Sequence, residues 1–309
     1  MSADFSRVSF YTWEQKKRRA RECLFFLEEI MFNNDSTTSR REFVKRVGAA
    51  AGATLFLGQS AFTAHAASSQ ERTQRHASGA GINVLLVHGA FVDASSWSKV
   101  IPLLQDKGYN VLAVQNPLTS FVDDVTTTSQ ALASLSGPTI LVGHSYGGNV
   151  ISNVGGTAGN VLSLVYIAAY APKEGESIQS INAHFPPPPL VKHLVPSYRA
   201  GFIWIDPPAF PQNFLQDVER TEARALAVAQ KPIVPGCFAA PSGAPTWKRV
   251  PSWYLVSKND RAIHPDAERF MARRMKAATR EIDSSHASPV SHPEEVFDLI
   301  VAASQGARH

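Results

Sequence analysis

The sequence has 309 residues, 44% of them hydrophobic, which is enough to bury one large core or two modest ones. Its formal charge of +4 comes mostly from residues 1–66, which hold 10 Lys or Arg and 7 Asp or Glu, against 20 and 19 in the remainder. The body therefore lacks the basic stripe that a nucleic-acid backbone requires. Its His, Cys and carboxylate residues also show no metal-ligand spacing, so we expect neither a nucleic-acid partner nor a metal.

The N-terminal 66 residues have the features of an export leader. Residues 39–45 read Ser-Arg-Arg-Glu-Phe-Val-Lys, and an uncharged stretch rich in Gly and Ala follows over 47–64. The stretch ends in Ala64-His65-Ala66, a small-x-small pattern typical of a cleavage site. This arrangement resembles a twin-arginine signal, so we expect the export machinery of that pathway as a partner and a periplasmic location. An uncleaved membrane anchor is the alternative, although so short a Gly/Ala-rich segment would span a bilayer only weakly.

Residues 1–30, before this signal, and residues 67–80, after it, fit no part of it. Residues 16–21 are strongly basic and 24–30 are apolar, so translation starting at Met31 is our hypothesis and residues 1–30 would be an over-extended start. Residues 67–80 are rich in Ser, Gln, Arg, Thr, Ala and Gly, which predicts a linker. The folded domain is then expected over 81–309.

In this domain short apolar runs alternate with longer amphipathic ones. Strands are predicted over 82–87, 111–114, 139–142, 162–170, 253–256 and 279–282. Helices are predicted over 97–104, 125–135, from 147 onward, 265–275 and 293–303. Strands that are apolar throughout and separated by helices indicate a mostly parallel six-stranded α/β sheet covered on both faces.

About 80 residues between Tyr170 and Ser252 break this rhythm. A plain connection between a strand and a helix takes only a few residues, so an insertion is predicted over about 173–245. It holds a proline run at 186–189 and an amphipathic helix pattern over 214–229. We expect a small helical cap over the carboxyl edge of the sheet, where ligands bind in open α/β folds; a surface excursion is the alternative.

The segment Gly143-His144-Ser145-Tyr146-Gly147 matches Gly-x-Ser-x-Gly between a predicted strand and a predicted helix. In that context the pattern indicates a nucleophilic serine on a turn too tight for side chains two residues before and after it. Ser145 would lie at a helix N-terminus, whose dipole favours developing negative charge.

A serine nucleophile needs a base, and the sequence offers ten histidines. His286 follows the last predicted strand, where the chain order Ser, Asp, His puts the base, whereas His292 fits the start of the next helix. Asp260 follows the strand before it and is the predicted acid, with Glu174 as the alternative. We expect His88, at the end of the first strand, to hold its loop by hydrogen bonds.

With these residues, the chain resembles the α/β-hydrolase superfamily. His88-Gly89-Ala90-Phe91 and Gly-His-Ser-Tyr-Gly-Gly at 143–148 are similar to those of small bacterial serine hydrolases related to the plant methylesterase and hydroxynitrile-lyase group. The resemblance covers 82–303 and implies acyl transfer without a cofactor. It also implies an oxyanion hole formed by the backbone N–H groups of Ala90 and Tyr146, with Phe91 as the alternative donor.

The expected function is a carboxylesterase-like serine hydrolase that cleaves a small, fairly apolar ester through an acyl-enzyme on Ser145. Phe91 and Trp204 are the predicted substrate contacts. A cofactor-free haloperoxidase, a C–C hydrolase or a hydroxynitrile lyase could use the same triad, although the resemblance would require a hydroxyl residue at Ala90 in a lyase. A non-catalytic receptor for a small ligand is the alternative from another class.

Overall fold

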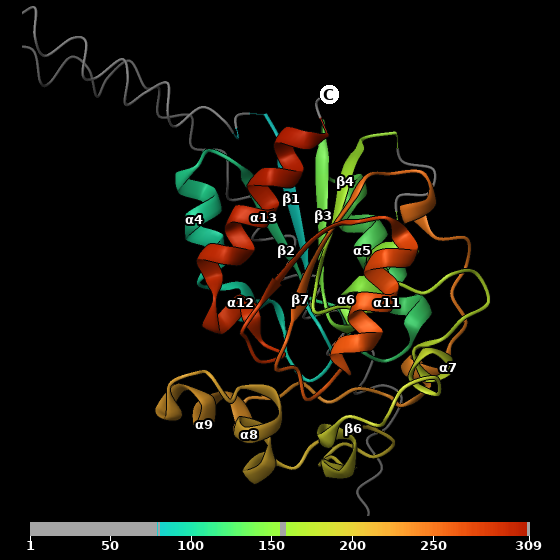
Figure 1. Cartoon of the computed structure of the whole chain (residues 1–309), viewed down its shortest axis with the longest axis vertical. Coiled ribbons are helices and arrows are strands. Elements are labelled where there is room, and N and C mark those ends of the chain that lie inside the picture. The colour runs from blue at the N-terminus through green and yellow to red at the C-terminus, as the bar shows by residue number, and fades with distance from the viewer. Residues whose placement is uncertain (1–78, 80, 155–158, 308–309) are drawn as a thin grey trace, which may run out of the picture. The chain divides into compact units, whose positions relative to one another are not determined.

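The computed structural model describes residues 79, 81–154 and 159–307 (Figure 1). The predicted leader at 1–66 and nearly all of the linker lie outside the described residues. The export signal, its cleavage site and the start at Met31 therefore stay predictions.

The centre of the fold is a six-stranded sheet in which every neighbouring pair is parallel, in the order β2-β1-β3-β4-β7-β8. The strands are β1 (Asn83–Val87), β2 (Asn110–Val114), β3 (Thr139–His144), β4 (Val161–Ile167), β7 (Ser252–Ser257) and β8 (Ala278–Ile282). Each lies in one of the predicted strand segments to within two residues, except β4, which ends three residues early. Ala168 there has a φ of 43°, and Tyr170 N–H donates to the Ser145 carbonyl at 3.0 Å. The apolar run continues, but the chain turns to pack against Ser145.

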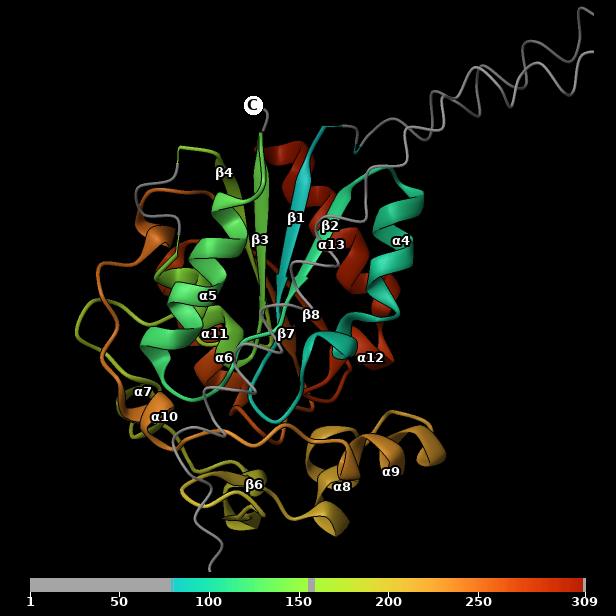
Figure 2. The same cartoon turned by 180° about the vertical axis from the view of Figure 1, so that it is seen from behind.

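Helices cover both faces of the sheet, as predicted (Figures 1 and 2). One face carries α4 (Val100–Asp106) and α13 (Pro293–Gly306), and the other carries α5 (Phe121–Ala133), α6 (Tyr146–Ser152) and α11 (Pro265–Met275). Strand β1 is fully buried and sends alternate side chains to the two faces: Val84 and Leu86 to the first, Leu85 and Val87 to the second. This two-sided burial is why the strands read as continuous apolar runs. Short elements follow β1 and precede α13: the 3₁₀ helix η2 (Ala94–Trp97) and helix α12 (Ser288–Ser291).

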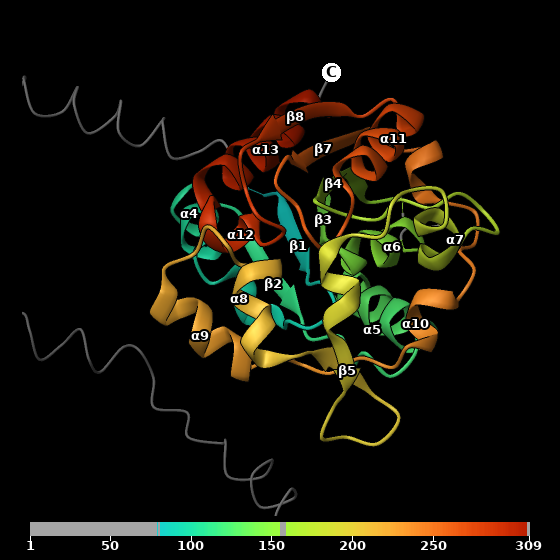
Figure 3. The same ribbon diagram turned by 60° about the horizontal axis from the view of Figure 1, so that its bottom comes forward.

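The insertion between β4 and β7 forms a cap beneath the carboxyl edge of the sheet (Figures 1 and 3). Its elements are α7 (Ile178–Asn182), η3 (Pro189–His193), β5 (Leu194–Pro196), β6 (Ile203–Ile205), η4 (Pro207–Ala209), α8 (Phe210–Phe214), α9 (Arg220–Val228), α10 (Gly236–Ala239) and η5 (Thr246–Lys248). The antiparallel pair of β5 and β6 has no counterpart in the sequence prediction. Strands of three residues are too short to show an alternating pattern.

The prediction of a single helix over 214–229 is wrong. Helix α8 ends at Phe214, and α9 begins only at Arg220, capped by the Glu219 carboxylate, which accepts the N–H groups of Thr221 and Glu222. Hydrogen bonds to distant residues stabilise the non-helical segment between α8 and α9. Gln216 Nε2 donates to the Asn259 carbonyl at 2.6 Å, and Asp217 accepts the Ser285 N–H at 2.7 Å. Such contacts override the helical pattern of the sequence.

Among the helices of the described residues, none combines the length and the apolar composition that a membrane crossing requires.

Candidate active site

Ser145 lies between β3 and α6 in a strained backbone conformation, with φ 53° and ψ −122°. A Cβ atom on Gly143 would lie 2.7 Å from the carbonyl carbon of Gly147, and one on Gly147 would lie 2.7 Å from the His88 oxygen and closer still to that of Val87. These neighbours are backbone atoms that cannot rotate away. Both glycines of the Gly-x-Ser-x-Gly pattern are therefore required for the turn that presents Ser145.

Ser145, His286 and Asp260 form one chain of hydrogen bonds. His286 Nε2 lies 2.8 Å from Ser145 Oγ, and its Nδ1 lies 2.5 Å from Asp260 Oδ2. The other oxygen of Asp260 accepts the N–H groups of Ala262 at 2.6 Å and Ile263 at 2.8 Å. All three side chains are buried. With Nδ1–H donating to the carboxylate, Nε2 holds a lone pair directed at the serine hydroxyl, as a general base requires.

The sheet brings Asp260 and His286 together because β7 and β8 are neighbours and the loops that carry these residues start at the carboxyl ends of these strands. Ser284 Oγ donates to Ser257 Oγ at 2.8 Å, and Asn259 N–H donates to the Ser284 carbonyl at 3.1 Å. The break between α8 and α9 adds a second tie, since Gln216 and Asp217 bind the residues next to the acid and the base. The alternatives lie elsewhere: His292 contacts Ser291 and Asp217, and Glu174 is exposed.

Two backbone N–H groups near Ser145 are the candidates for an oxyanion hole. Ala90 N–H has no backbone hydrogen-bond partner in the described part of the chain. Tyr146 is the first residue of α6, where the N–H has no acceptor within the helix. The alternative donor, Phe91, forms an antiparallel bridge with Lys231, whose N–H donates to the Phe91 carbonyl at 3.2 Å. In the described part of the chain the Phe91 N–H also has no backbone acceptor, so Phe91 stays an alternative.

His88 fixes the loop that carries Ala90, in agreement with the sequence expectation. Its Nε2 accepts the Asn116 N–H at 3.1 Å, and its Nδ1 lies 2.8 Å from the Gly89 carbonyl, to which it donates. Burial lowers the pKa of His88 to about 4, so the ring is neutral and can accept at one nitrogen while it donates at the other.

Asp124 holds the side chain of Tyr146, the residue after Ser145, and the sequence pattern did not predict this role. The Tyr146 hydroxyl donates to Asp124 Oδ2 at 2.6 Å, and Leu118 N–H donates to the other oxygen at 2.8 Å. Burial raises the pKa of this carboxyl. In the sequence Asp124 is one of two acids in the first turn of a helix, where a carboxylate ordinarily serves the helix dipole.

Ser145 and His286 open into a cavity of about 480 Å³, which we call the active-site cavity. Half of its lining residues are apolar residues of the cap, and its polar groups are few. They include the Tyr170 hydroxyl, which donates to Asn182 Oδ1 at 3.0 Å, and the exposed Gln179. The remaining lining residues are Ala90, Phe91, Ile178, Pro187, Pro188, Leu190, Val191, Leu194, Phe214, Pro235, Phe238, Ala262 and Ile263.

Of the two predicted substrate contacts, only Phe91 lines this cavity. Trp204 is on β6, where its ring lies 5.6 Å from that of Tyr198 in an edge-on contact. A strand of only three residues gives no periodicity that would show which way a side chain faces. Trp204 therefore belongs to the cap's own packing in this structure.

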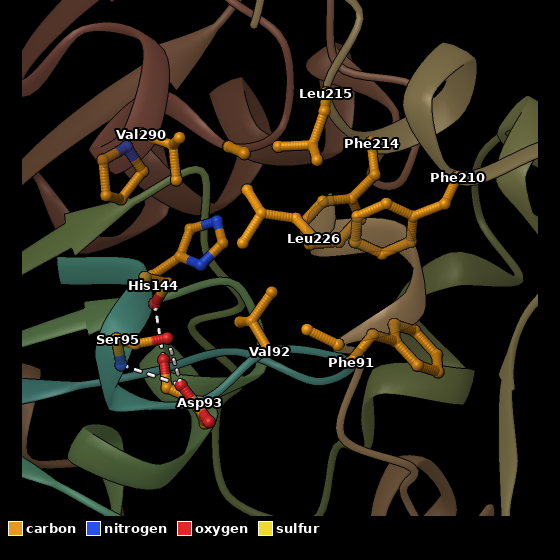
Figure 4. Close-up of a pocket in the computed structure, with 14 residues that line it drawn as sticks. Phe91, Val92, Asp93, Ser95, His144, Phe210, Phe214, Leu215, Leu226 and Val290 are labelled. Atoms are coloured by element: carbon orange, nitrogen blue, oxygen red, sulfur yellow. Dashed lines mark hydrogen bonds between the residues drawn. The ribbon is translucent and has the colours of Figure 1, made fainter. Parts of the chain in front are cut away.

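A second cavity of about 60 Å³ lies beyond Phe91 and Phe214, which line both (Figure 4). His144 faces it with a buried Nδ1 that has no hydrogen-bond partner among the described residues, while its Nε2 lies 2.9 Å from the His286 carbonyl. Burial holds the pKa of His144 well below its ordinary value. His144 is thus a neutral donor to the loop of the base and not a second base for Ser145.

Comparison with known proteins agrees with this geometry. Residues 84–299 match the alpha/beta hydrolase family, so the chain belongs to that family. A carbendazim-hydrolysing esterase from Nocardioides sp. (strain SG-4G) is 29% identical over 134 residues, which cover 38% of this chain and 54% of that enzyme. The chain thus matches about half the length of this curated relative.

Solved structures share the fold at low sequence identity. A pyrethroid hydrolase from Sphingobium faniae JZ-2 has a TM-score of 0.64 at 20% identity, covering 74% of this chain and all of that one. Polyneuridine aldehyde esterase gives 0.63 at 19% identity over 72% and 98%. A methylesterase from Arabidopsis gives 0.62 at 17% identity over 73% and 99%. These neighbours confirm the α/β-hydrolase fold, which the chain shares with the plant methylesterase.

Proposed function

We propose that the protein is a serine hydrolase of the carboxylesterase type, acting through an acyl-enzyme on Ser145. The observation that carries this proposal is the hydrogen-bonded chain from Asp260 through His286 to Ser145 at the base of a largely apolar cavity. The esterase and hydrolase names of the relatives support the same class of reaction.

In the proposed reaction Ser145 Oγ attacks the ester carbonyl as its proton moves to His286 Nε2. Asp260 stabilises the imidazolium ion, and the N–H groups of Ala90 and Tyr146 bind the oxyanion, each contributing about 3–4 kcal/mol to the barrier reduction. Collapse of the tetrahedral intermediate breaks the C–O bond, and the leaving alcohol takes the proton from His286. Water then attacks the acyl-enzyme with His286 as base and releases the acid.

The size and lining of the cavity support a proposal for the substrate class. A volume of about 480 Å³ lies within the range of roughly 300–1,000 Å³ typical of small-molecule sites, so it accepts an ester larger than an acetate. Its apolar walls favour alkyl or aryl groups, and the amide of Asn182 gives one polar contact at the α7 side. We therefore propose a medium-sized apolar ester that carries at most one remote polar group.

The alternatives to an esterase are other reactions on the same triad and a non-catalytic receptor. A hydroxynitrile lyase of the resembled group would call for a hydroxyl residue at Ala90, and a receptor would have no use for a general base aligned on Ser145. Haloperoxidase and C–C hydrolase activities share all these parts and are assayed beside the esters.

The test is the hydrolysis of p-nitrophenyl acetate, butyrate and octanoate by the full chain and by Ser145→Ala. We expect the mutant rate to fall by about 10³ or more, with butyrate or octanoate preferred over acetate. Ser304→Ala, a buried serine of α13 outside the cavity, is the matched control and keeps the rate. Equal rates for wild type and Ser145→Ala would refute the proposal.

We also propose that the leader exports this enzyme to the periplasm by the twin-arginine route. Replacing Arg40 and Arg41 by lysine is expected to keep the protein in the cytoplasmic fraction, and the exported wild type is expected to begin near residue 67. A mature protein that retains residues 39–45 would contradict cleavage.

A further inference from the structure

Glu268 is a fully buried acid behind the triad that the mechanism above does not use. It lies on α11, eight residues after Asp260, and has no solvent exposure. Its Oε2 accepts the Ser257 N–H at 3.1 Å, at the end of β7. Its Oε1 has no N–H or O–H donor in the described part of the chain. Besides the Ser257 N–H, its carboxyl lies within hydrogen-bonding reach of the carboxyl of Asp260.

Two buried carboxyl groups in contact hold one proton between them, because two negative charges in that position repel each other strongly. The surrounding donors decide which group carries the proton. Asp260 accepts from the Ala262 and Ile263 N–H groups and from His286, whereas Glu268 accepts from one donor in the described segments, the Ser257 N–H. The charge is therefore better stabilised on Asp260, and the proton belongs to Glu268.

The other groups facing Glu268 do not reverse this assignment. Tyr254 and Tyr170 are neutral phenols, whose pKa values burial raises further. The guanidinium of Arg269 attracts a charge on Glu268, but it binds Glu281 and Asp266 at the protein surface. Burial and the neighbouring Asp260 together hold the pKa of Glu268 well above its ordinary value.

We propose that Glu268 is a positioning residue of the triad, whose carboxylic acid O–H donates a hydrogen bond to Asp260 and holds it in the orientation that accepts from His286. The proposal rests on the proposed hydrolase function. It gives the unpaired Oε1 a role, because a protonated Glu268 donates where an ionised one could only accept. Glu268 thereby ties together the end of β7, the loop of the acid and helix α11.

Two substitutions separate this role from packing. Glu268→Gln keeps the shape, accepts the Ser257 N–H and donates an amide N–H to Asp260 without any charge. Glu268→Met keeps the length and volume but can do neither. Met275→Leu, two turns further along α11 in the same core, is the packing control.

The experiment measures the rate at which a fluorophosphonate probe labels Ser145 in the full chain, together with kcat, KM and the pH profile for p-nitrophenyl butyrate. We expect Glu268→Gln to keep the labelling rate within about threefold and the acid limb of the pH profile in place. We expect Glu268→Met to lower labelling and kcat by roughly 10- to 100-fold with KM nearly unchanged, and to move the acid limb to lower pH. Met275→Leu should resemble wild type in all of these.

Three results would overturn the inference. Wild-type labelling of Glu268→Met would remove any positioning role. A loss in Glu268→Gln equal to that in Glu268→Met would show that a hydrogen-bonding neutral side chain is not sufficient. A shift of the acid limb in Glu268→Gln alone would show that wild-type Glu268 is charged. If Glu268→Met does not fold, a fall in labelling of tenfold or more in Glu268→Gln would still refute the inference. A wild type that neither reacts with the probe nor hydrolyses esters would instead refute the proposed function.

Discussion

The protonated state of Glu268 makes a prediction about stability that needs no substrate. In the unfolded chain this side chain ionises with an ordinary pKa of about 4.3, whereas in the folded chain it keeps its proton well above that pH. Between those two values the folded state binds one more proton than the unfolded state. Stability therefore falls as the pH rises through this window, by up to about 1.4 kcal/mol per pH unit from this residue alone.

Glu268→Gln cannot titrate and so removes this contribution. We expect its free energy of unfolding to approach that of wild type near pH 4.5 and to exceed it by a growing margin at higher pH. From pH 5 to pH 6 the margin should widen by roughly 1 kcal/mol. The assay is urea unfolding of the full chain followed by circular dichroism at half-unit pH steps, with Glu174→Gln, at an exposed carboxyl, as the control. A constant difference between the two proteins across this range would refute the assignment of the proton to Glu268.

Three further predictions concern the tight turn at Ser145, the hydrogen bond between Tyr146 and Asp124, and the active-site cavity. Gly147→Ala should destabilise the fold by about 3 kcal/mol or more and abolish labelling of Ser145, because the new Cβ would meet the carbonyl oxygens of Val87 and His88; Gly236→Ala, where the nearest atom is 3.8 Å away, should be tolerated in a thermal melt. Tyr146→Phe should cost about 1–3 kcal/mol in urea unfolding, since it deprives buried Asp124 of a donor, but should change kcat less than tenfold because the backbone N–H is kept. Leu190→Trp should narrow the active-site cavity and shift the p-nitrophenyl ester preference toward acetate, whereas Trp204→Ala should leave the chain-length profile unchanged; the reverse pattern would restore Trp204 as a substrate contact.

The sheet and the triad could be predicted because local pattern and chain order carry the information. A parallel sheet buried on both faces requires apolar runs, and each strand end then marks a position at one edge. Gly143 and Gly147 flank Ser145 at one such end, and Asp260 and His286 follow two neighbouring strands. The roles assigned to these residues still depend on the proposed chemistry, but their proximity follows from the order of the strands.

The cap could not be predicted in the same way, because its structure depends on contacts with the sheet domain. Residues 214–229 carry a helical pattern, yet Gln216 and Asp217 bind the loops of the acid and the base and interrupt it. Trp204 lies in a hairpin whose strands have three residues each, so no repeat shows its direction.

Unlike the structure of the cap, the burial of Glu268 could have been predicted from the sequence. On a helix over 265–275 it lies three, four and seven residues before Met271, Ala272 and Met275, which form the buried face. An acid on an apolar stripe predicts a partner in the interior, and a search for such positions would have identified it.

The most direct test of the central claim is mass spectrometry of the full chain quenched during turnover of p-nitrophenyl butyrate. We expect a butyryl group on the peptide that contains Ser145, and no such adduct in Ser145→Ala. Turnover without an adduct on Ser145, or an adduct on another residue that survives in Ser145→Ala, would contradict the account.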